Sequence, residues 1–162
     1  MSSQDLFEIL PGALNAIAVL KHAGIRVIVV SNQRGIALGR YSSDDVNRIH
    51  DVLQRALAAA NARVDAFYFC PHEKGECNCR KPLPGLFEQA KADFPEIDGA
   101  TSLMIGDSLS DVEFGTRLGM LTVFIEGDPE HRKPGAVKAK SIADLACASL
   151  ADAVELILTL RN

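Results

Sequence analysis

The sequence lacks any apolar run approaching the ~20 residues that a membrane-spanning helix needs. Its first residues, MSSQDLF, contain neither a basic segment nor an apolar stretch, so we expect no secretory signal peptide. Basic residues are not in excess either. The 17 Lys and Arg stand against 21 Asp and Glu, a net charge of −4 that gives no basis for nucleic-acid binding. These absences predict a cytoplasmic protein without a membrane or nucleic-acid partner.

Cysteine is also scarce, since only four occur in 162 residues. In the cytosol, such cysteines are more often free thiols or metal ligands than disulfides. No internal repeat, low-complexity tract or interdomain linker divides the chain. Apolar residues make up 48% and charged residues 23%, close to the globular average. Length and composition therefore predict a single domain over 1–162.

Short apolar runs alternate with segments of helical spacing. Runs that are apolar at nearly every position are typical of strands buried on both faces of a parallel sheet, and we expect strands at 25–31, 65–70, 102–106 and 121–125. Helical patterns or end signals predict helices at 11–24, 43–57, 84–94, 107–118 and 150–160. The Gly-, Pro- and charge-rich segment 126–135 is expected to be a surface loop. The pattern predicts a Rossmann-like α/β domain of three layers, α/β/α, with a mostly parallel sheet.

The segment CPHEKGECNCRKP (70–82) is the strongest local signal. Three thiols and one imidazole within ten residues match the ligand set of a closed, structural zinc site, and a closed set leaves no position for a catalytic water. The alternative, unrelated thiols on a surface loop, is disfavoured by this clustering. The predicted zinc ligands are Cys70, His72, Cys77 and Cys79. Cys147 stands apart in an apolar context and is expected to be a small buried hydrophobe.

Polar residues follow the first predicted strand, where ligands bind in open α/β sheets. Ser31 ends this strand, and Asn32 and Gln33 follow it. The hydroxyl, the amides and nearby backbone N–H groups could donate to an anion. A Ser-Asn pair after a strand more often forms a turn than a binding site, so this signal alone is weak.

Two carboxylates, Asp107 and Asp111, follow the predicted strand 102–106. Carboxylate oxygens at a strand tip can hold Mg²⁺, which keeps several waters. The alternative is helix capping by Asp107 or Ser108, with Asp111 stabilised near the positive end of the helix.

A basic pair, Arg80 and Lys81, directly follows the last predicted zinc ligand. Held by a rigid loop, Arg80 could grip a phosphate with two hydrogen bonds and Lys81 could act as a point charge. The alternative is a solvated pair of cations.

The order of VVSNQ (29–33), CPH…CNCRKP (70–82) and GDSLSD (106–111) resembles the zinc-loop phosphatases of the haloacid dehalogenase superfamily over nearly the whole chain. The resemblance implies that Ser31 and Asn32 bind the transferring phosphoryl group. It also implies that Lys81 offsets the charge on phosphate and nucleophile. Asp107 and Asp111 would help to hold Mg²⁺.

The same resemblance assigns the remaining candidates. Arg80 would grip the substrate, and the structural zinc loop would replace a mobile cap in a nearly capless enzyme. The implied activity is Mg²⁺-dependent hydrolysis of a small sugar-phosphate monoester. NQRGIALG (32–39) and GDSLSD (106–111) favour heptose 1,7-bisphosphate as the substrate, with histidinol phosphate as the alternative.

One part of the family pattern is missing. Its first strand ends in Asp-x-Asp, which supplies the nucleophile and the general acid/base, and no Asp-x-Asp occurs in this sequence. We therefore expect an inactive chain that lacks the central strand. Its sheet would close by direct pairing of 25–31 with 102–106, or another segment, such as the residues near 6–10, or another subunit would fill the slot. A non-catalytic zinc-stabilised phosphate-binding protein, or a sequence begun at an internal methionine, are the other interpretations.

Overall fold

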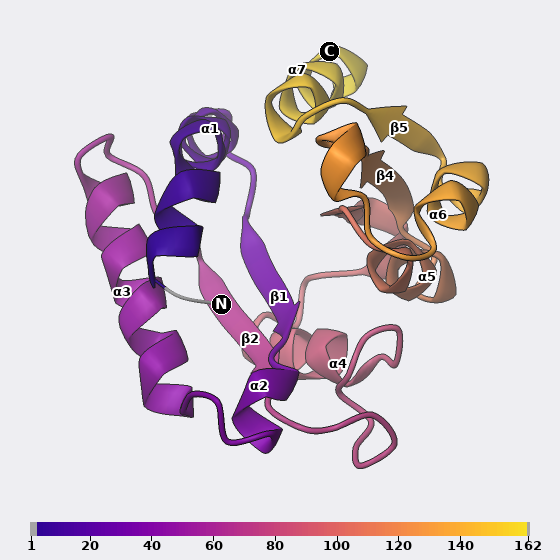
Figure 1. Cartoon of the computed structure of the whole chain (residues 1–162). Coiled ribbons are helices and arrows are strands. Elements are labelled where there is room, and N and C mark those ends of the chain that lie inside the picture. The colour runs from indigo at the N-terminus through magenta and orange to yellow at the C-terminus, as the bar shows by residue number, and fades with distance from the viewer. Residues whose placement is uncertain (1–2, 162) are drawn as a thin grey trace.

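The computed structural model describes residues 3–161 and contains helices alternating with parallel strands (Figure 1). In chain order the longer elements are α1 (Ser3–His22), β1 (Ile28–Asn32), α2 (Arg34–Ala37), α3 (Ser43–Ala58), β2 (Ala66–Cys70), α4 (Gly85–Asp93), β3 (Leu103–Gly106), α5 (Leu109–Arg117), β4 (Leu121–Ile125), α6 (Ala136–Ile142), β5 (Leu145–Cys147) and α7 (Leu150–Arg161). Single 3₁₀ turns occur at Gly99–Thr101 and Pro129–His131. The four predicted strands are confirmed. None of the described helices is long and apolar enough to cross a membrane.

The strands form two parallel sheets. β1 pairs with β2 in a register that sets Ile28 beside Ala66 and Asn32 beside Cys70. The second sheet has the order β3-β4-β5. The sequence did not predict β5. Its three residues are of mixed burial and form no clear apolar run. Cys147 lies in β5 and is half-buried, so its expected full burial is wrong.

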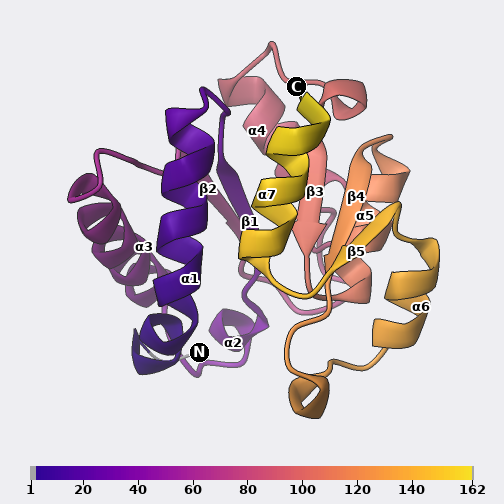
Figure 2. The same ribbon diagram turned by 90° about the horizontal axis from the view of Figure 1, so that it is seen from above.

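Helices cover both faces of the sheets, as expected for three layers. On one face, α1 and α3 pack against β1 and β2 through a core that includes Ile17, Leu57 and Val64. On the other face, Leu86 of α4 packs against Cys70 at the end of β2. α5 and α6 share a core with β4. Viewed from above, α1 and α7 lie side by side (Figure 2), and Ala16, Leu20 and Val154 form the core between them.

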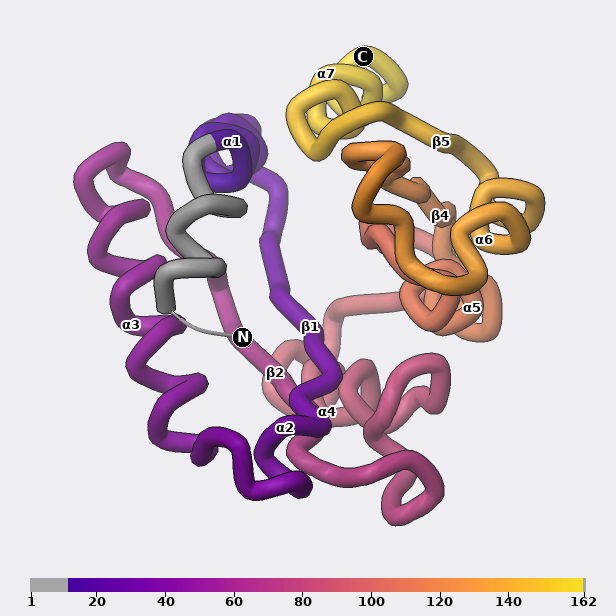
Figure 3. Tube along the Cα trace, viewed as in Figure 1, coloured from indigo at the N-terminus to yellow at the C-terminus, as the bar shows by residue number. Residues whose placement is uncertain are grey.

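Among residues 3–161, β1 pairs with β2 and β3 pairs with β4, and no pairing joins β1 to β3. The expected direct pairing of 25–31 with 102–106 is therefore wrong for this chain. Residues 6–10, the expected filler, belong to helix α1. The tube trace in Figure 3 shows β1 and β2 on one side of the molecule and β4 and β5 on the other.

Side-chain caps begin some of the helices. α3 begins with a capping box, in which the Ser42 hydroxyl accepts from the Asp45 N–H and the Asp45 carboxylate accepts from the Ser42 N–H. At α7, the Ser149 hydroxyl accepts from the Asp152 N–H, which confirms Ser149 as the cap. α1 begins at Ser3 and not at Pro11. Between β1 and α3 the chain forms only the four-residue α2, which matches a nearly capless fold.

Candidate active site

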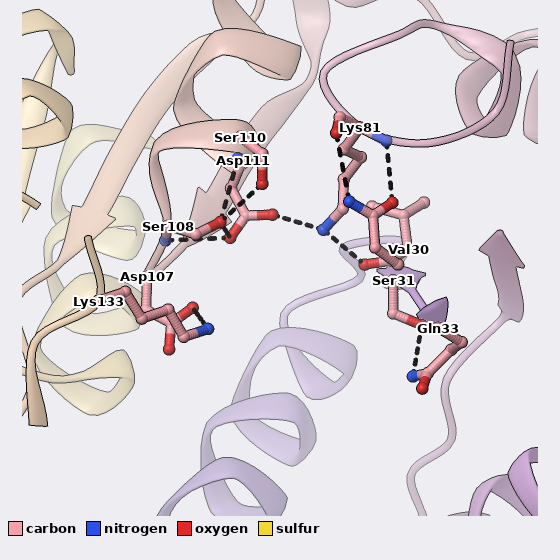
Figure 4. A network of polar contacts seen from close by, with 10 residues as sticks. Val30, Ser31, Gln33, Lys81, Asp107, Ser108, Ser110, Asp111 and Lys133 are labelled. Atoms are coloured by element: carbon pink, nitrogen blue, oxygen red, sulfur yellow. Dashed lines mark hydrogen bonds and ion pairs between the residues drawn. The ribbon is translucent and has the colours of Figure 1, made fainter. Parts of the chain in front are cut away.

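The predicted residues come from three neighbouring elements at the carboxyl ends of β1, β2 and β3. Figure 4 shows a network of polar contacts that links the tip of β1, the loop after β2 and the start of α5. Lys81 lies at its centre. Its ammonium donates to the Val30 carbonyl at 3.2 Å and to Asp111 Oδ1 at 2.5 Å. Lys81 therefore joins β1 to α5 across the unpaired edges of the two sheets.

Burial makes the Lys81–Asp111 pair unusual among the described ion pairs. Each side chain is only 9% exposed. A single buried charge would destabilise the fold strongly, since it loses its hydration. Here each charge is compensated by its partner. The alternative of a solvated Arg-Lys pair is therefore wrong for Lys81.

Asn32 holds the backbone of Lys81 in place. Asn32 Oδ1 accepts from the Lys81 N–H at 2.9 Å, and Asn32 Nδ2 donates to the Lys81 carbonyl at 3.2 Å. This double hydrogen bond ties the tip of β1 to the loop after β2. Both polar atoms of the Asn32 side chain bond the Lys81 backbone, so the role of Asn32 in this structure is to position Lys81.

Asp111 and Asp107 occupy different environments. Asp111 is buried and forms a capping box with Ser108, whose hydroxyl accepts from the Asp111 N–H. Asp111 Oδ2 accepts from the Ser108 N–H and hydroxyl. Helix capping by Ser108, one of the alternatives from the sequence, is thus confirmed. A Cβ at Gly106 would lie 2.3 Å from Asp111 Oδ2, which explains the glycine at the tip of β3.

Asp107 is exposed, and its carboxylate accepts from Lys133 Nζ at 2.8 Å. Lys133 lies in the predicted surface loop 126–135, and sequence reasoning did not select it. Asp107 and Lys133 also line a cavity of about 190 Å³ between β4 and this loop. The sequence could have pointed to Lys133 only through the basic run His131-Arg132-Lys133. Composition alone predicts that such a run is exposed to solvent.

Gln33, which the sequence predicts to bind substrate, is buried between two side chains. Its Nε2 donates to Ser31 Oγ at 3.2 Å, and its Oε1 accepts from the Tyr41 hydroxyl at 2.6 Å. Tyr41 was missed because no motif connects an aromatic residue to a position eight residues earlier. Ser31 stays half-buried at the tip of β1.

Arg80 carries a donor that is not used. Its Nη1 is buried and has no hydrogen-bond partner among the residues that the structure describes. A buried guanidinium nitrogen without a partner is costly. An acceptor supplied from outside the protein, such as a phosphate oxygen, would satisfy it.

The four predicted zinc ligands converge at the end of β2. Their ligand atoms all lie within 4.8 Å of one another. Cys70 Sγ lies 3.3 Å from Cys77 Sγ, and His72 Nδ1 lies 3.3 Å from Cys79 Sγ. Ligands at ~2.0–2.3 Å around a tetrahedral zinc stand roughly 3.5–3.8 Å apart. The donor set and its geometry therefore fit a metal such as zinc, and the unrelated-thiol alternative is wrong.

The thiols of this cluster differ in acidity. Burial raises the pKa of Cys70, and burial together with the neighbouring thiols raises that of Cys79 to about 12. Burial also opposes ionisation of Cys77. Hydrogen bonds from the Cys70 thiol and from backbone N–H groups outweigh it and lower the pKa of Cys77 to about 6.

The loop that carries the cluster is anchored at both ends. Glu73 accepts from Arg34 Nε of α2 at 2.5 Å, which joins the loop to the segment after β1. A Cβ at Gly85 would lie 2.6 Å from Cys79 Cα, so α4 begins in direct contact with the cluster. The same loop therefore fixes both the cluster and the Arg80-Lys81 pair that follows it.

Known proteins share this fold. A HAD-hydrolase-like family model matches residues 78–153. The D-glycero-beta-D-manno-heptose-1,7-bisphosphate 7-phosphatase of Salmonella typhi is 33% identical over 156 residues, which cover 91% of this chain and 81% of that protein. The chain belongs to the haloacid dehalogenase-like hydrolases. Its relatives in this family include phosphatases of both heptose anomers.

Two further relatives show how far the likeness extends. The D-glycero-alpha-D-manno-heptose-1,7-bisphosphate 7-phosphatase of Mycobacterium tuberculosis (strain CDC 1551 / Oshkosh) is 42% identical over 108 residues, 66% of this chain and 57% of that protein. The crystal structure of D,D-heptose 1,7-bisphosphate phosphatase from B. bronchiseptica, complexed with magnesium and phosphate, superposes with a TM-score of 0.79. It is 32% identical and covers 93% of this chain and 84% of that one. The Rossmann-like α/β fold expected from the sequence is thus confirmed.

Proposed function

We propose that this chain carries the phosphate-binding part of a Mg²⁺-dependent sugar-phosphate phosphatase of the cytoplasm, with a heptose 1,7-bisphosphate as the substrate. The observation that carries the proposal is the buried Lys81 ammonium beside the tip of β1. The residue before it in the sequence, Arg80, has a buried Nη1 that finds no hydrogen-bond partner among the described residues. These cations suit the oxygens of a phosphate monoester. The names of the relatives support the heptose, and histidinol phosphate is the second substrate to test.

Each residue would have a defined role toward the phosphate. The Ser31 hydroxyl and the Arg80 guanidinium would donate to phosphate oxygens, and Lys81 would offset their charge. Asn32 would hold Lys81 through its backbone. Phosphoryl transfer depends mainly on such positioning and charge stabilisation.

Asp107 is the carboxylate best placed for Mg²⁺, since it is exposed at the tip of β3 and already attracts a cation, Lys133. A bound magnesium would neutralise charge on the phosphate. Asp111, the other predicted ligand, now contacts Lys81 and Ser108, so its binding of the ion would require these contacts to break. Zinc held by the cysteine cluster would be structural.

The sequence contains no Asp-x-Asp to form and hydrolyse an aspartyl-phosphate. We therefore propose that residues 1–162 alone bind phosphate without turning over substrate. This property is shared with the second candidate, a non-catalytic zinc-stabilised phosphate-binding protein, which the absent motif favours.

The test combines binding and turnover. Inorganic phosphate should bind the purified chain with Mg²⁺, and Arg80→Ala and Lys81→Met should each weaken binding. Lys74→Ala, an exposed lysine in the same loop, is the matched control. Both heptose bisphosphate anomers and histidinol phosphate should release no phosphate. Turnover that disappears in Asp107→Asn would show that another carboxylate serves as the nucleophile, and absence of phosphate binding would refute the site itself.

A further inference from the structure

Gln33 connects the candidate phosphate donor Ser31 to a residue with no assigned role, Tyr41. Gln33 is 6% exposed, and both ends of its side-chain amide are engaged. Its Nε2 donates to Ser31 Oγ at 3.2 Å, and its Oε1 accepts from the Tyr41 hydroxyl at 2.6 Å. The three side chains form a chain of hydrogen bonds that ends at the tip of β1, where Figure 4 shows Gln33 beneath Ser31.

The direction of these bonds decides what Ser31 can do. A tyrosine hydroxyl has one proton, and here it is donated to the oxygen of the Gln33 amide. The amide oxygen therefore faces Tyr41, and the NH₂ group faces Ser31. The Ser31 oxygen accepts that bond, so its own single proton remains available for another acceptor.

The chain of bonds is anchored from two sides. The Gln33 N–H donates to the Cys70 carbonyl at 2.8 Å, which fixes its backbone beside the end of β2. The Tyr41 ring packs against Gly35, where a Cβ would lie 2.2 Å from a ring carbon. Tyr41 is itself half-buried. The glycine thus lets the ring reach Gln33.

We propose that Tyr41 and Gln33 are positioning residues that aim the Ser31 hydroxyl proton at a bound phosphate oxygen. This inference rests on the proposed phosphate site. Neither residue needs to touch the phosphate. Without the Tyr41 hydroxyl the amide can turn over, and its oxygen then accepts the Ser31 proton. A phosphate would lose a donor and meet an oxygen lone pair in its place.

The experiment measures inorganic phosphate binding by calorimetry in a double-mutant cycle. Tyr41→Phe removes one hydroxyl and keeps the ring, and we expect it to weaken binding about 3–10-fold, a part of what a hydrogen bond to a charged group contributes. Ser31→Ala should weaken binding at least as much. In the Ser31→Ala background, Tyr41→Phe should have no further effect, because it acts through the serine.

Tyr68→Phe is the matched control, since Tyr68 is the other tyrosine and its hydroxyl donates to Asp93 of α4. It should leave phosphate affinity unchanged. Thermal unfolding of each variant verifies that it is folded, and the cycle compares folded proteins only.

Two results would overturn the inference while leaving the phosphate site intact. One is a Tyr41→Phe protein that binds phosphate as well as the parent. The other is an equal loss on Tyr41→Phe with and without Ser31. If parent and Tyr68→Phe both fail to bind phosphate, the proposed function is refuted, and the inference falls with it.

Discussion

Lys81 Nζ lies 2.5 Å from Asp111 Oδ1, and this buried contact joins the loop after β2 to the start of α5. Lys133 and Asp107 form a second Lys–Asp pair nearby, at 2.8 Å, but both side chains are more than half exposed. Both are Lys–Asp ion pairs, but one is buried and the other is exposed. Comparing variants of the two pairs therefore separates the effect of burial on stability from the effect of charge.

Lys81→Met should lower the free energy of unfolding by about 3–5 kcal/mol, because it leaves the Asp111 charge buried without its partner. Asp111→Asn added to Lys81→Met should recover part of this loss. Lys133→Ala is the control, and as an exposed pair it should change stability by less than about 1 kcal/mol. Urea denaturation measures all four proteins. Equal losses for Lys81→Met and Lys133→Ala would contradict the burial argument.

The cysteine cluster should bind one equivalent of zinc per chain, measured by metal analysis of the purified protein. Cys77→Ser should lose the metal, and a loss of about 3 kcal/mol would lower Tm by roughly 6–12 °C in a protein of this size. Cys147→Ser, which lies outside the cluster in β5, should keep both metal and Tm. A parent protein with less than about half an equivalent of a closed-site metal would refute this prediction.

Asp65 should stabilise the fold in a pH-dependent way. It accepts from Lys21 Nζ of α1 at 2.6 Å and from the Val27 N–H at 2.8 Å. Burial favours the neutral acid, but the Lys21 and Val27 hydrogen bonds outweigh it and hold the pKa of Asp65 below its usual 3.8. The folded state therefore binds the proton less tightly than the unfolded chain does.

Asp65→Asn should accordingly cost about 1.5–3 kcal/mol at neutral pH. The difference from the parent should be complete above pH 3.8 and should shrink as the pH falls through the lower folded-state pKa. Glu96→Gln, which breaks the exposed pair with Arg26, is the control and should cost little at any pH. A cost of Asp65→Asn that stays constant down to pH 2 would show that the carboxylate charge is not responsible.

Lys133 should compete with a divalent cation for Asp107. Lys133→Ala removes the competing ammonium, so Mg²⁺ affinity measured by calorimetry should rise about 2–5-fold, the scale of an exposed ion pair. Lys140→Ala has the same charge change and breaks a pair with Glu126. The two variants should therefore differ. Equal gains in both would indicate net charge alone, and Asp107→Asn should abolish the binding.

Sequence patterns predicted the elements whose signal is local. The apolar runs located β1, β2, β3 and β4 to within a few residues, because strands buried on both faces have no polar positions. The cysteine spacing located the metal cluster, because its ligands lie within one loop. β5 escaped because it is short and partly exposed at the edge of its sheet.

Contacts between distant segments could not be predicted in this way. The sequence places Lys81 thirty positions from Asp111 and cannot show that they meet in the interior. Likewise, Gln33 suggested a substrate contact because it follows Asn32, whereas packing of Tyr41 over Gly35 directs its amide into the protein. The expected pairing of 25–31 with 102–106 is also a contact between distant segments, and the structure places these strands in two separate sheets.

The missing ladder between β1 and β3 has a consequence for how the molecule unfolds. One half keeps its own core around Leu57 and Val64, and the other keeps a core around Val112 and Phe124. The α1–α7 core and the Lys81–Asp111 pair link them. The halves should therefore act as two foldons whose amide protons exchange with different opening free energies. Lys81→Met should increase the difference between these two opening free energies. It removes a link between the foldons, so that one separates from the other before either core unfolds.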